Sequence, residues 1–298
     1  GADGHQKDLY TLAEEAGYTV ARTNAEASAI NASTDQAILI DEDLADSDAM
    51  AYEIDRTSDM WSLADYVEKG IEVLNNSKGF FLMCEGGKID WACHANDAAS
   101  TIHDTQALAD AVQVAVDFAK KHPSDTLILV TGDHETGGLT IGYAGTDYDT
   151  YLDLLENQKI SFAKFDSDYV AKYKTEKTPF ADVLRDVEKL FGLKASGAQS
   201  DKLVLTDYEM QQLKTAYEKS VNGTAASPYD QEESILYGTY EPLSVTIINN
   251  KSGVSFTSYS HTGLPVAVLA EGAGADTFNG YYDNTQIYTK LAALVGVR

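Results

Sequence analysis

The stretch from 126 to 138 reads TLILVTGDHETGG. It opens with a nearly continuous apolar run from Thr126 to Val130, which is typical of a β-strand covered on both faces. Glycines and polar residues follow at once, among them Asp133 and His134. Ligands of open α/β sheets bind just past the carboxyl ends of the strands. We therefore expect a buried strand that delivers Asp133 and His134 to a functional site.

An alternation of strand-like and helical segments surrounds this stretch in the first 145 residues. Four strands are predicted, at 18–22, 36–40, 80–84 and 126–130. Apolar side chains at helical spacing predict two helices between them, at 58–74 and 105–119. Such alternation is typical of a layered α/β domain whose sheet is largely parallel.

A change of composition between about 151 and 234 predicts a helical insertion in this domain. Within it, the run from Thr206 to Glu209 has the capping-box pattern that starts a helix, and Asn222-Gly223 fits the end of that helix. After the insertion the sheet is expected to resume, with strands at 244–248 and 266–270 and a closing helix at 284–294. We thus expect one incomplete α/β domain over 1–298 that contains an insertion at 151–234.

The composition excludes several classes of protein. The 298 residues hold 22 basic and 47 acidic side chains, which gives a formal net charge of −25. Such a charge repels phosphodiester backbones, and no cluster of Lys or Arg reverses it locally, so recognition of a nucleic-acid sequence is not expected. No stretch approaches the roughly 20 apolar residues of a membrane-spanning helix. The chain begins with Gly1 and without a signal-peptide pattern, so its N-terminus is expected to have been removed or left out.

Three short polar clusters stand beside the predicted strands. The first reads EGGKIDWACH from 85 to 94, the second TGDHETGG from 131 to 138 and the third SYSHTG from 258 to 263. In the first, Asp90 and His94 are four residues apart, so a helical turn would place both side chains on one side. A carboxylate and an imidazole so placed can share one divalent metal ion, because both are ordinary zinc ligands. Together the clusters offer three carboxylates and three imidazoles: Glu85, Asp90, Asp133, His94, His134 and His261.

Each cluster also has an ordinary interpretation. A lone Asp–His pair is more often a surface or capping pair than a set of metal ligands, and only the three clusters together favour a metal site. Glu135 is expected beside the ligands or on the surface, because the Thr-Gly-Gly after it suggests a mobile loop. The two cysteines, Cys84 and Cys93, are too few for a disulfide scaffold and are expected in the core. The remaining histidines are expected at exposed or helix-end positions: His5, His103 and His122.

The stretches EGGKIDWACH, VTGDHETGG and SHTG, in this order, resemble the alkaline phosphatase family. The resemblance covers about 1–142 and 245–298 and implies the three-layer α/β/α sheet of that family, here partial. It also implies two zinc ions and one magnesium ion, the first zinc held by Asp90, His94 and His261, the second by Asp133 and His134, and the magnesium by Glu85. Many relatives carry Lys or His near the phosphate at the position where this chain has Trp91.

The activity that the resemblance implies is hydrolysis of small phosphate monoesters through a phosphoserine intermediate. The family's serine nucleophile lies upstream in an Asp-Ser-Ala type motif, and nothing before Glu85 supplies it, since the string at 46–49 reads DSDA. We therefore interpret the chain as the C-terminal portion of an alkaline phosphatase that is inactive alone. Two alternatives stay open: a zinc-binding remnant without catalysis, and another hydrolase of the superfamily, such as a phosphodiesterase or a sulfatase. The resemblance further implies a periplasmic or secreted protein and is compatible with a homodimer.

Overall fold

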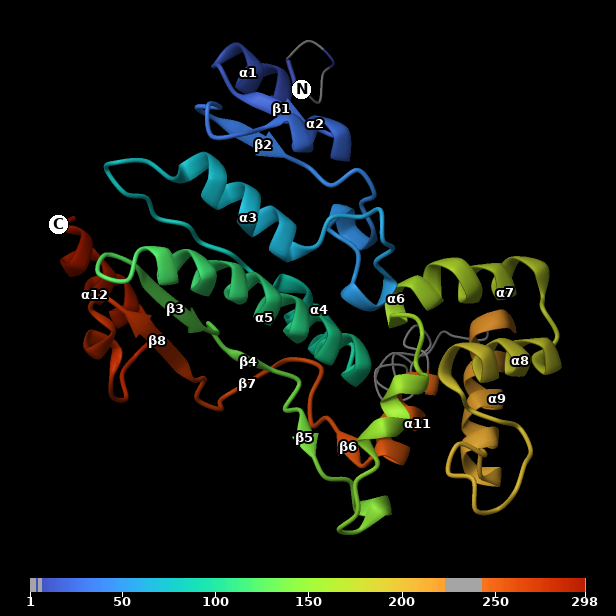
Figure 1. Cartoon of the computed structure of the whole chain (residues 1–298). Coiled ribbons are helices and arrows are strands. Elements are labelled where there is room, and N and C mark those ends of the chain that lie inside the picture. Colours follow the sequence, from blue (N-terminus) through green and yellow to red (C-terminus); the bar gives the residue numbers. More distant parts are fainter. Residues whose placement is uncertain (1–3, 5–6, 223–242, 298) are drawn as a thin grey trace.

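The computed structural model describes residues 4, 7–222 and 243–297 (Figure 1). The described strands form two-stranded pairs: β1 (Thr19–Ala21) with β2 (Ala37–Leu39), β3 (Leu127–Thr131) with β8 (Val268–Gly272), β4 (Glu135–Thr136) with β7 (His261–Thr262), and β5 (Thr140–Ile141) with β6 (Val254–Ser255). The strands expected at 18–22, 36–40 and 126–130 are thus confirmed in position, and the one expected at 266–270 lies two residues later. The expectation that the strand at 126–130 is buried on both faces is wrong, because β3 is half-buried from Leu127 to Val130 and exposed at Thr131.

The direction of these pairs differs from the expectation of a largely parallel sheet. Only β1 and β2 run parallel among the described strands, whereas the other three pairs are antiparallel. The reason lies in the order of pairing, because β6, β7 and β8 return along β5, β4 and β3 in reverse sequence. The two stretches 127–141 and 254–272 therefore form one long antiparallel ribbon, and 142–253 leaves from its tip. The mixed α/β class is confirmed.

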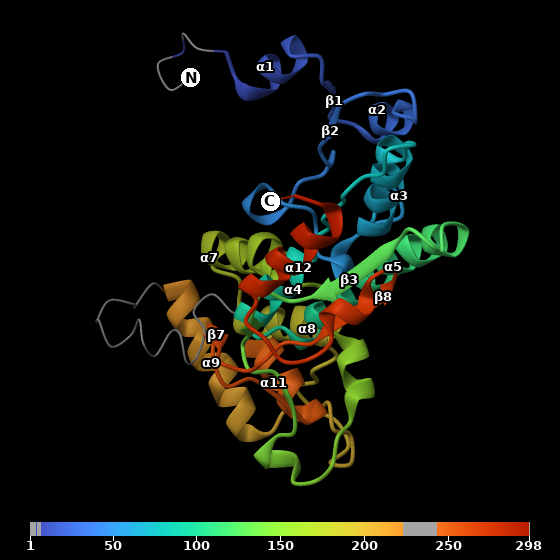
Figure 2. The same cartoon turned by 90° about the vertical axis from the view of Figure 1, so that its left-hand side faces the viewer.

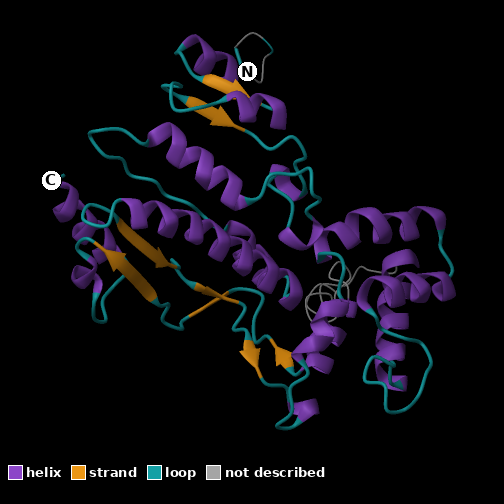
Figure 3. Ribbon diagram, in the orientation of Figure 1, coloured by secondary structure: helices purple, strands orange, loops and turns teal. Residues whose placement is uncertain are grey.

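Helices make up most of the remaining described structure (Figure 3). Those of the first half are α1 (Leu9–Glu15), α2 (Asn24–Ala29), α3 (Leu63–Leu74), α4 (Gly87–His94) and α5 (Ala98–Lys121). Those of the second half are α6 (Phe162–Phe165), α7 (Ala171–Glu176), α8 (Phe180–Phe191), α9 (Asp207–Asn222), α11 (Leu243–Ser252) and α12 (Thr285–Val295). None of the helices in these described ranges is both long and apolar enough to cross a bilayer.

Two N-cap residues fix where α3 and α5 begin. The helix expected at 58–74 begins at Leu63, because Ser62 and Asp65 form a capping box there. The helix expected at 105–119 begins earlier, at Ala98, because the side chain of Asp97 accepts a hydrogen bond from the Ser100 backbone N–H. In Figures 1 and 2, α5 lies along the β3–β8 pair with α3 beyond it, and β1 and β2 lie farther out.

The predicted strand at 80–84 is wrong, because this segment has no strand partner among the described residues. Phe80 packs edge-on against Phe118 of α5, with ring centroids 5.7 Å apart. Phe81 and Met83 are 66% and 77% exposed. The run is apolar enough for a strand, but in the described structure helices cover part of it and no neighbouring backbone pairs with it.

The segment expected as an insertion contains the helices α6, α7, α8 and α9 in its described part, 151–222. They surround a core that includes Phe165, Val187 and Phe191. The capping box is confirmed, since the backbone N–H of Glu209 donates to Thr206 Oγ1 and the backbone N–H of Thr206 donates to Glu209 Oε2. α9 ends at Asn222, whereas Gly223 and the rest of the expected insertion lie outside the described residues.

The predicted strand at 244–248 is wrong, because these residues lie in α11. Val245, Ile247 and Ile248 are all buried, so the helix is surrounded by the same core as α8 and α9. A helix that is buried all round shows no apolar stripe, and a short apolar run of this kind cannot be told from a strand by its period. The closing helix is confirmed as α12.

Candidate metal centre

The helix α4 carries the first two candidate ligands. It begins after Gly86 and ends at His94, so Asp90 and His94 stand one turn apart, as expected. The distance from His94 Nε2 to Asp90 Oδ2 is 3.5 Å. The other ring nitrogen of His94, Nδ1, lies 2.6 Å from the carbonyl oxygen of Tyr259. Because a carbonyl oxygen only accepts, Nδ1 carries a proton, and Nε2 is the ring nitrogen that faces Asp90.

The loop after β3 carries the next two candidates. β3 ends at Thr131 and β4 begins at Glu135, so the strand has given way where Asp133 and His134 stand. This confirms that both residues can face one site although they are adjacent in the sequence. The distance from His134 Nε2 to Asp133 Oδ2 is 3.5 Å. The Asp133 side chain is 84% exposed, whereas that of His134 is 31% exposed.

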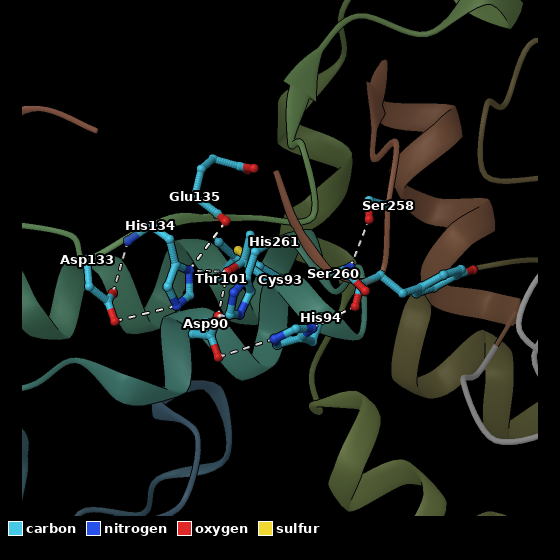
Figure 4. Close-up of polar contacts among 12 residues, drawn as sticks. Asp90, Cys93, His94, Thr101, Asp133, His134, Glu135, Ser258, Ser260 and His261 are labelled. Carbon is cyan, nitrogen blue, oxygen red and sulfur yellow. Dashed lines mark hydrogen bonds and ion pairs between the residues drawn. The ribbon is translucent and has the colours of Figure 1, made fainter. Parts of the chain in front are cut away.

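His261 on β7 closes the cluster (Figure 4). Its ring stacks on that of His134 with centroids 3.4 Å apart, and the ring of His94 lies 5.2 Å away. His261 Nε2 is 3.9 Å from Asp90 Oδ1. Asp90, His134 and His261 each offer a ligand atom, and these three atoms lie within 4.8 Å of one another. Three segments far apart in the sequence thus converge on one group of oxygen and nitrogen donors.

Two glycines after β4 allow this convergence. Gly137 has a φ of +82°, and a Cβ there would lie 2.7 Å from the carbonyl oxygen of Cys93 at the end of α4. Gly138 has a φ of +62°, and a Cβ there would lie 2.0 Å from Thr257 Oγ1. Both values of φ favour glycine, and both sites lack room for a side chain. The Thr-Gly-Gly turn, expected as a mobile loop, is therefore closely packed between α4 and the segment before β7.

Glu135 holds this turn against the neighbouring strand. Its carboxylate accepts hydrogen bonds from the backbone N–H of Gly138, at 2.8 Å, and from the hydroxyl of Thr262. The expectation that Glu135 stands beside the ligands is consistent with these contacts. Cys93 is buried as expected, whereas Cys84 is exposed, contrary to expectation, because helices cover only part of the 80–84 segment to which it belongs.

Glu85 and Trp91 are not part of the cluster of ligand atoms. Glu85 is exposed, and no hydrogen bond or ion pair in the described structure joins it to Asp90 or to the three histidines. The ring of Trp91 lies below Lys88, with Nζ 4.2 Å from the ring centroid. Lys88 is 9% exposed, and its Nζ has no hydrogen-bond partner among the described residues. The same Nζ lies 4.3 Å from the ring centroid of Tyr52. Burial lowers the pKa of Lys88.

The other histidines stand apart from the centre. His122 is the C-cap of α5 and stacks on Phe118, as expected for a helix-end position. His103 is half-buried within α5, so the expectation of an exposed or helix-end position is wrong for it, and His5 lies outside the described residues. Sequence reasoning missed Thr136, whose hydroxyl contacts two candidate ligands. The signal that the sequence offered was its place in the same polar cluster, two residues after His134.

By its fold and its ligand set, the chain is an α/β protein with a carboxylate–imidazole centre at the ends of its strands. A family model described as alkaline phosphatase matches residues 1–297. The chain therefore belongs to the alkaline phosphatase family.

Two relatives from Bacillus subtilis (strain 168) show how far the likeness extends. Alkaline phosphatase 3 is 36% identical over 235 residues, which are 78% of this chain and 44% of that protein. Alkaline phosphatase 4 is 33% identical over 273 residues, 91% of this chain and 50% of that protein. Among solved structures, a cold-active alkaline phosphatase from the psychrophile Shewanella sp. has a TM-score of 0.73 and 28% identity, with 97% of this chain and 62% of that chain covered. The chain spans about half the length of these curated relatives.

Proposed function

We propose that this chain holds the zinc ligands of a metal-dependent phosphatase that hydrolyses small phosphate monoesters. The observation that carries the proposal is the convergence of Asp90, His134 and His261 within 4.8 Å in a member of the alkaline phosphatase family. The side chains of Asp90 and His261 are 34% and 50% exposed, so an ion bound there would stay open to a substrate. Catalytic zinc sites keep such an open position, whereas structural sites are closed.

The donor set fits zinc. Carboxylate oxygen and imidazole nitrogen are ordinary zinc ligands, and the imidazole of His94 is fixed by a backbone carbonyl oxygen in the way that metal-bound histidines usually are. Within the described residues, histidines are the only basic side chains within 4.0 Å of the Asp90 and Asp133 oxygens, so no lysine or arginine competes for these oxygens. Bound zinc would supply Lewis-acid stabilisation of charge on the phosphoryl group.

The division of the ligands between two ions is part of the proposal. The contacts of Asp90 with His94 and His261 support one site, and the contact of Asp133 with His134 supports the other. We assign Glu85 to magnesium from the resemblance alone. The phosphoserine route needs a serine from chain outside 1–298. The chain's own residues would hold the ions, and their charge would attract a phosphate dianion to a protein whose net charge is −25.

Replacement of one ligand tests the proposal. We would express the protein from its complete coding region and compare wild type, His261→Ala and the control His122→Ala, which lies at the far end of α5. We expect His261→Ala to lower bound zinc, measured by mass spectrometry, and to reduce the hydrolysis of p-nitrophenyl phosphate at least ~100-fold. The control should match wild type. Unchanged turnover in His261→Ala would refute the assignment.

The same experiment separates the alternatives. Zinc binding without any hydrolysis, even by the complete protein, would identify a non-catalytic remnant. Faster turnover of a phosphodiester or a sulfate ester than of the monoester would identify another hydrolase of the superfamily. The homodimer and the periplasmic or secreted location stay predictions.

A further inference from the structure

Thr136 contacts each member of the central ligand group. It is 7% exposed, and its hydroxyl donates a hydrogen bond to Asp90 Oδ1. The same oxygen lies 3.2 Å from His134 Nδ1. In the ladder between β4 and β7, Thr136 stands directly opposite His261. Thr136 thus contacts Asp90 and His134 through its side chain and pairs with His261 through its backbone. These are the three residues whose ligand atoms lie within 4.8 Å of one another.

The protons of this chain of contacts can be assigned. A threonine hydroxyl has one proton, and a carboxylate can only accept, so the hydroxyl proton points to Asp90. Toward His134, the oxygen of Thr136 can therefore only accept a hydrogen bond. His134 Nδ1 must then carry a proton and donate it to this hydrogen bond. The carbonyl oxygen of Glu135, 3.3 Å from the same nitrogen, is also an acceptor and requires the same tautomer. The ring nitrogen left to bind a metal ion is Nε2, which lies 3.5 Å from Asp133 Oδ2.

We propose that Thr136 is a positioning residue that couples the two metal sites through its hydroxyl group. It orients the Asp90 carboxylate of one site and the His134 imidazole of the other, while its backbone sets His261 opposite both. This inference rests on the proposed function, since it assigns a role toward the same metal ions. Outer partners of metal ligands of this kind typically change metal affinity by about 10- to 100-fold when they are removed.

Three variants test the role of the hydroxyl. Thr136→Val keeps the shape and removes the hydroxyl, and Thr136→Ser keeps the hydroxyl and removes the methyl group. Thr140→Val is the matched control, because Thr140 lies on the next short strand and is exposed, and within the described residues its hydroxyl donates only to the carbonyl oxygen of Gly138. Zinc affinity would be measured by competition with a chromophoric chelator, and the thermal stability of each metal-free protein would show whether it is folded.

We expect Thr136→Val to bind zinc about 10- to 100-fold more weakly. Thr136→Ser and Thr140→Val should lie within about threefold of wild type. A second readout is the imidazole ¹⁵N spectrum, in which the Nδ1–H tautomer of His134 should be less populated in Thr136→Val, with the carbonyl oxygen of Glu135 as its remaining acceptor.

The outcomes distinguish the two hypotheses. Wild type that binds no zinc would refute the proposed function itself. Wild type that binds zinc, together with Thr136→Val of equal affinity, would refute only the role of Thr136. Equal weakening in Thr136→Val and Thr136→Ser would refute it too, because the hydroxyl would then not be the group that matters. If Thr136→Val fails to fold without metal, the Thr136→Ser and wild-type affinities still decide, because a loss in Thr136→Ser contradicts the role.

Discussion

Asp104 makes the stability of this protein depend on pH in an unusual direction. The side chain is 8% exposed, and burial raises its pKa from 3.8 to about 7. Between these two values the folded chain keeps the proton and the unfolded chain has lost it. The unfolded state therefore binds fewer protons, and the free energy of unfolding falls as the pH rises through this window. The stabilisation is complete below pH 3.8 and is lost as the pH passes about 7.

The magnitude follows from the difference between the two pKa values. Each unit of that difference is worth about 1.36 kcal/mol, so the full loss is about 4 kcal/mol, of which about 3 kcal/mol falls between pH 5 and 8. Asp104→Asn removes the titration and keeps an oxygen that can accept the hydrogen bond from the Glu53 backbone N–H. The variant should thus be more stable than wild type at pH 8, and the advantage should shrink toward pH 5.

The assay is urea unfolding at several pH values between 5 and 8, with chelator present so that metal binding does not contribute. Asp117→Asn is the control, because Asp117 lies on the same helix, is exposed, and has its pKa lowered by the hydrogen bond from Lys120. Asp117 is therefore already ionised throughout this pH range. The free energy of unfolding of Asp117→Asn should depend on pH in the same way as that of wild type. Parallel curves for wild type and Asp104→Asn would refute the reasoning about burial.

Three further predictions concern packing and metal binding. Gly137→Ala should lower the free energy of unfolding by about 2–4 kcal/mol, because its φ is positive and the added Cβ would meet a backbone carbonyl oxygen of α4. Gly263→Ala is the control and should melt like wild type, because the space around Gly263 is open. Gln158→Ala should cost about 1.5–3 kcal/mol in urea unfolding, since Gln158 donates to the buried N-cap carboxylate of α5, while Gln113→Ala on the exposed face should stay within about 0.5 kcal/mol. Zinc at ~100 times its dissociation constant should add about 2.7 kcal/mol to the wild-type unfolding free energy, and an unchanged melting temperature would contradict a site in the folded state.

The local features of the site could be predicted from the order of the residues alone. Val130 ends an apolar run and polar residues follow, so the end of β3 and the loop with Asp133 and His134 could be predicted. The four-residue spacing of Asp90 and His94 fixed their common side of α4, because the helical period alone decides it. The capping box at Thr206 was predictable for the same reason, since every group in it lies within four residues.

The meeting of distant segments could not be predicted in this way, because it depends on how the elements pack. The helix at 243–252 lies where a strand was predicted, because a core contributed by other helices surrounds it and no local period records that burial. The run at 80–84 has the composition of a strand, but pairing needs a second backbone, which the described chain does not bring to it. The hydroxyl of Thr136 reaches Asp90 across 46 residues of sequence. Hydrogen bonds and ligand sets depend on distances in space, and those are fixed by how the elements pack rather than by any spacing along the chain.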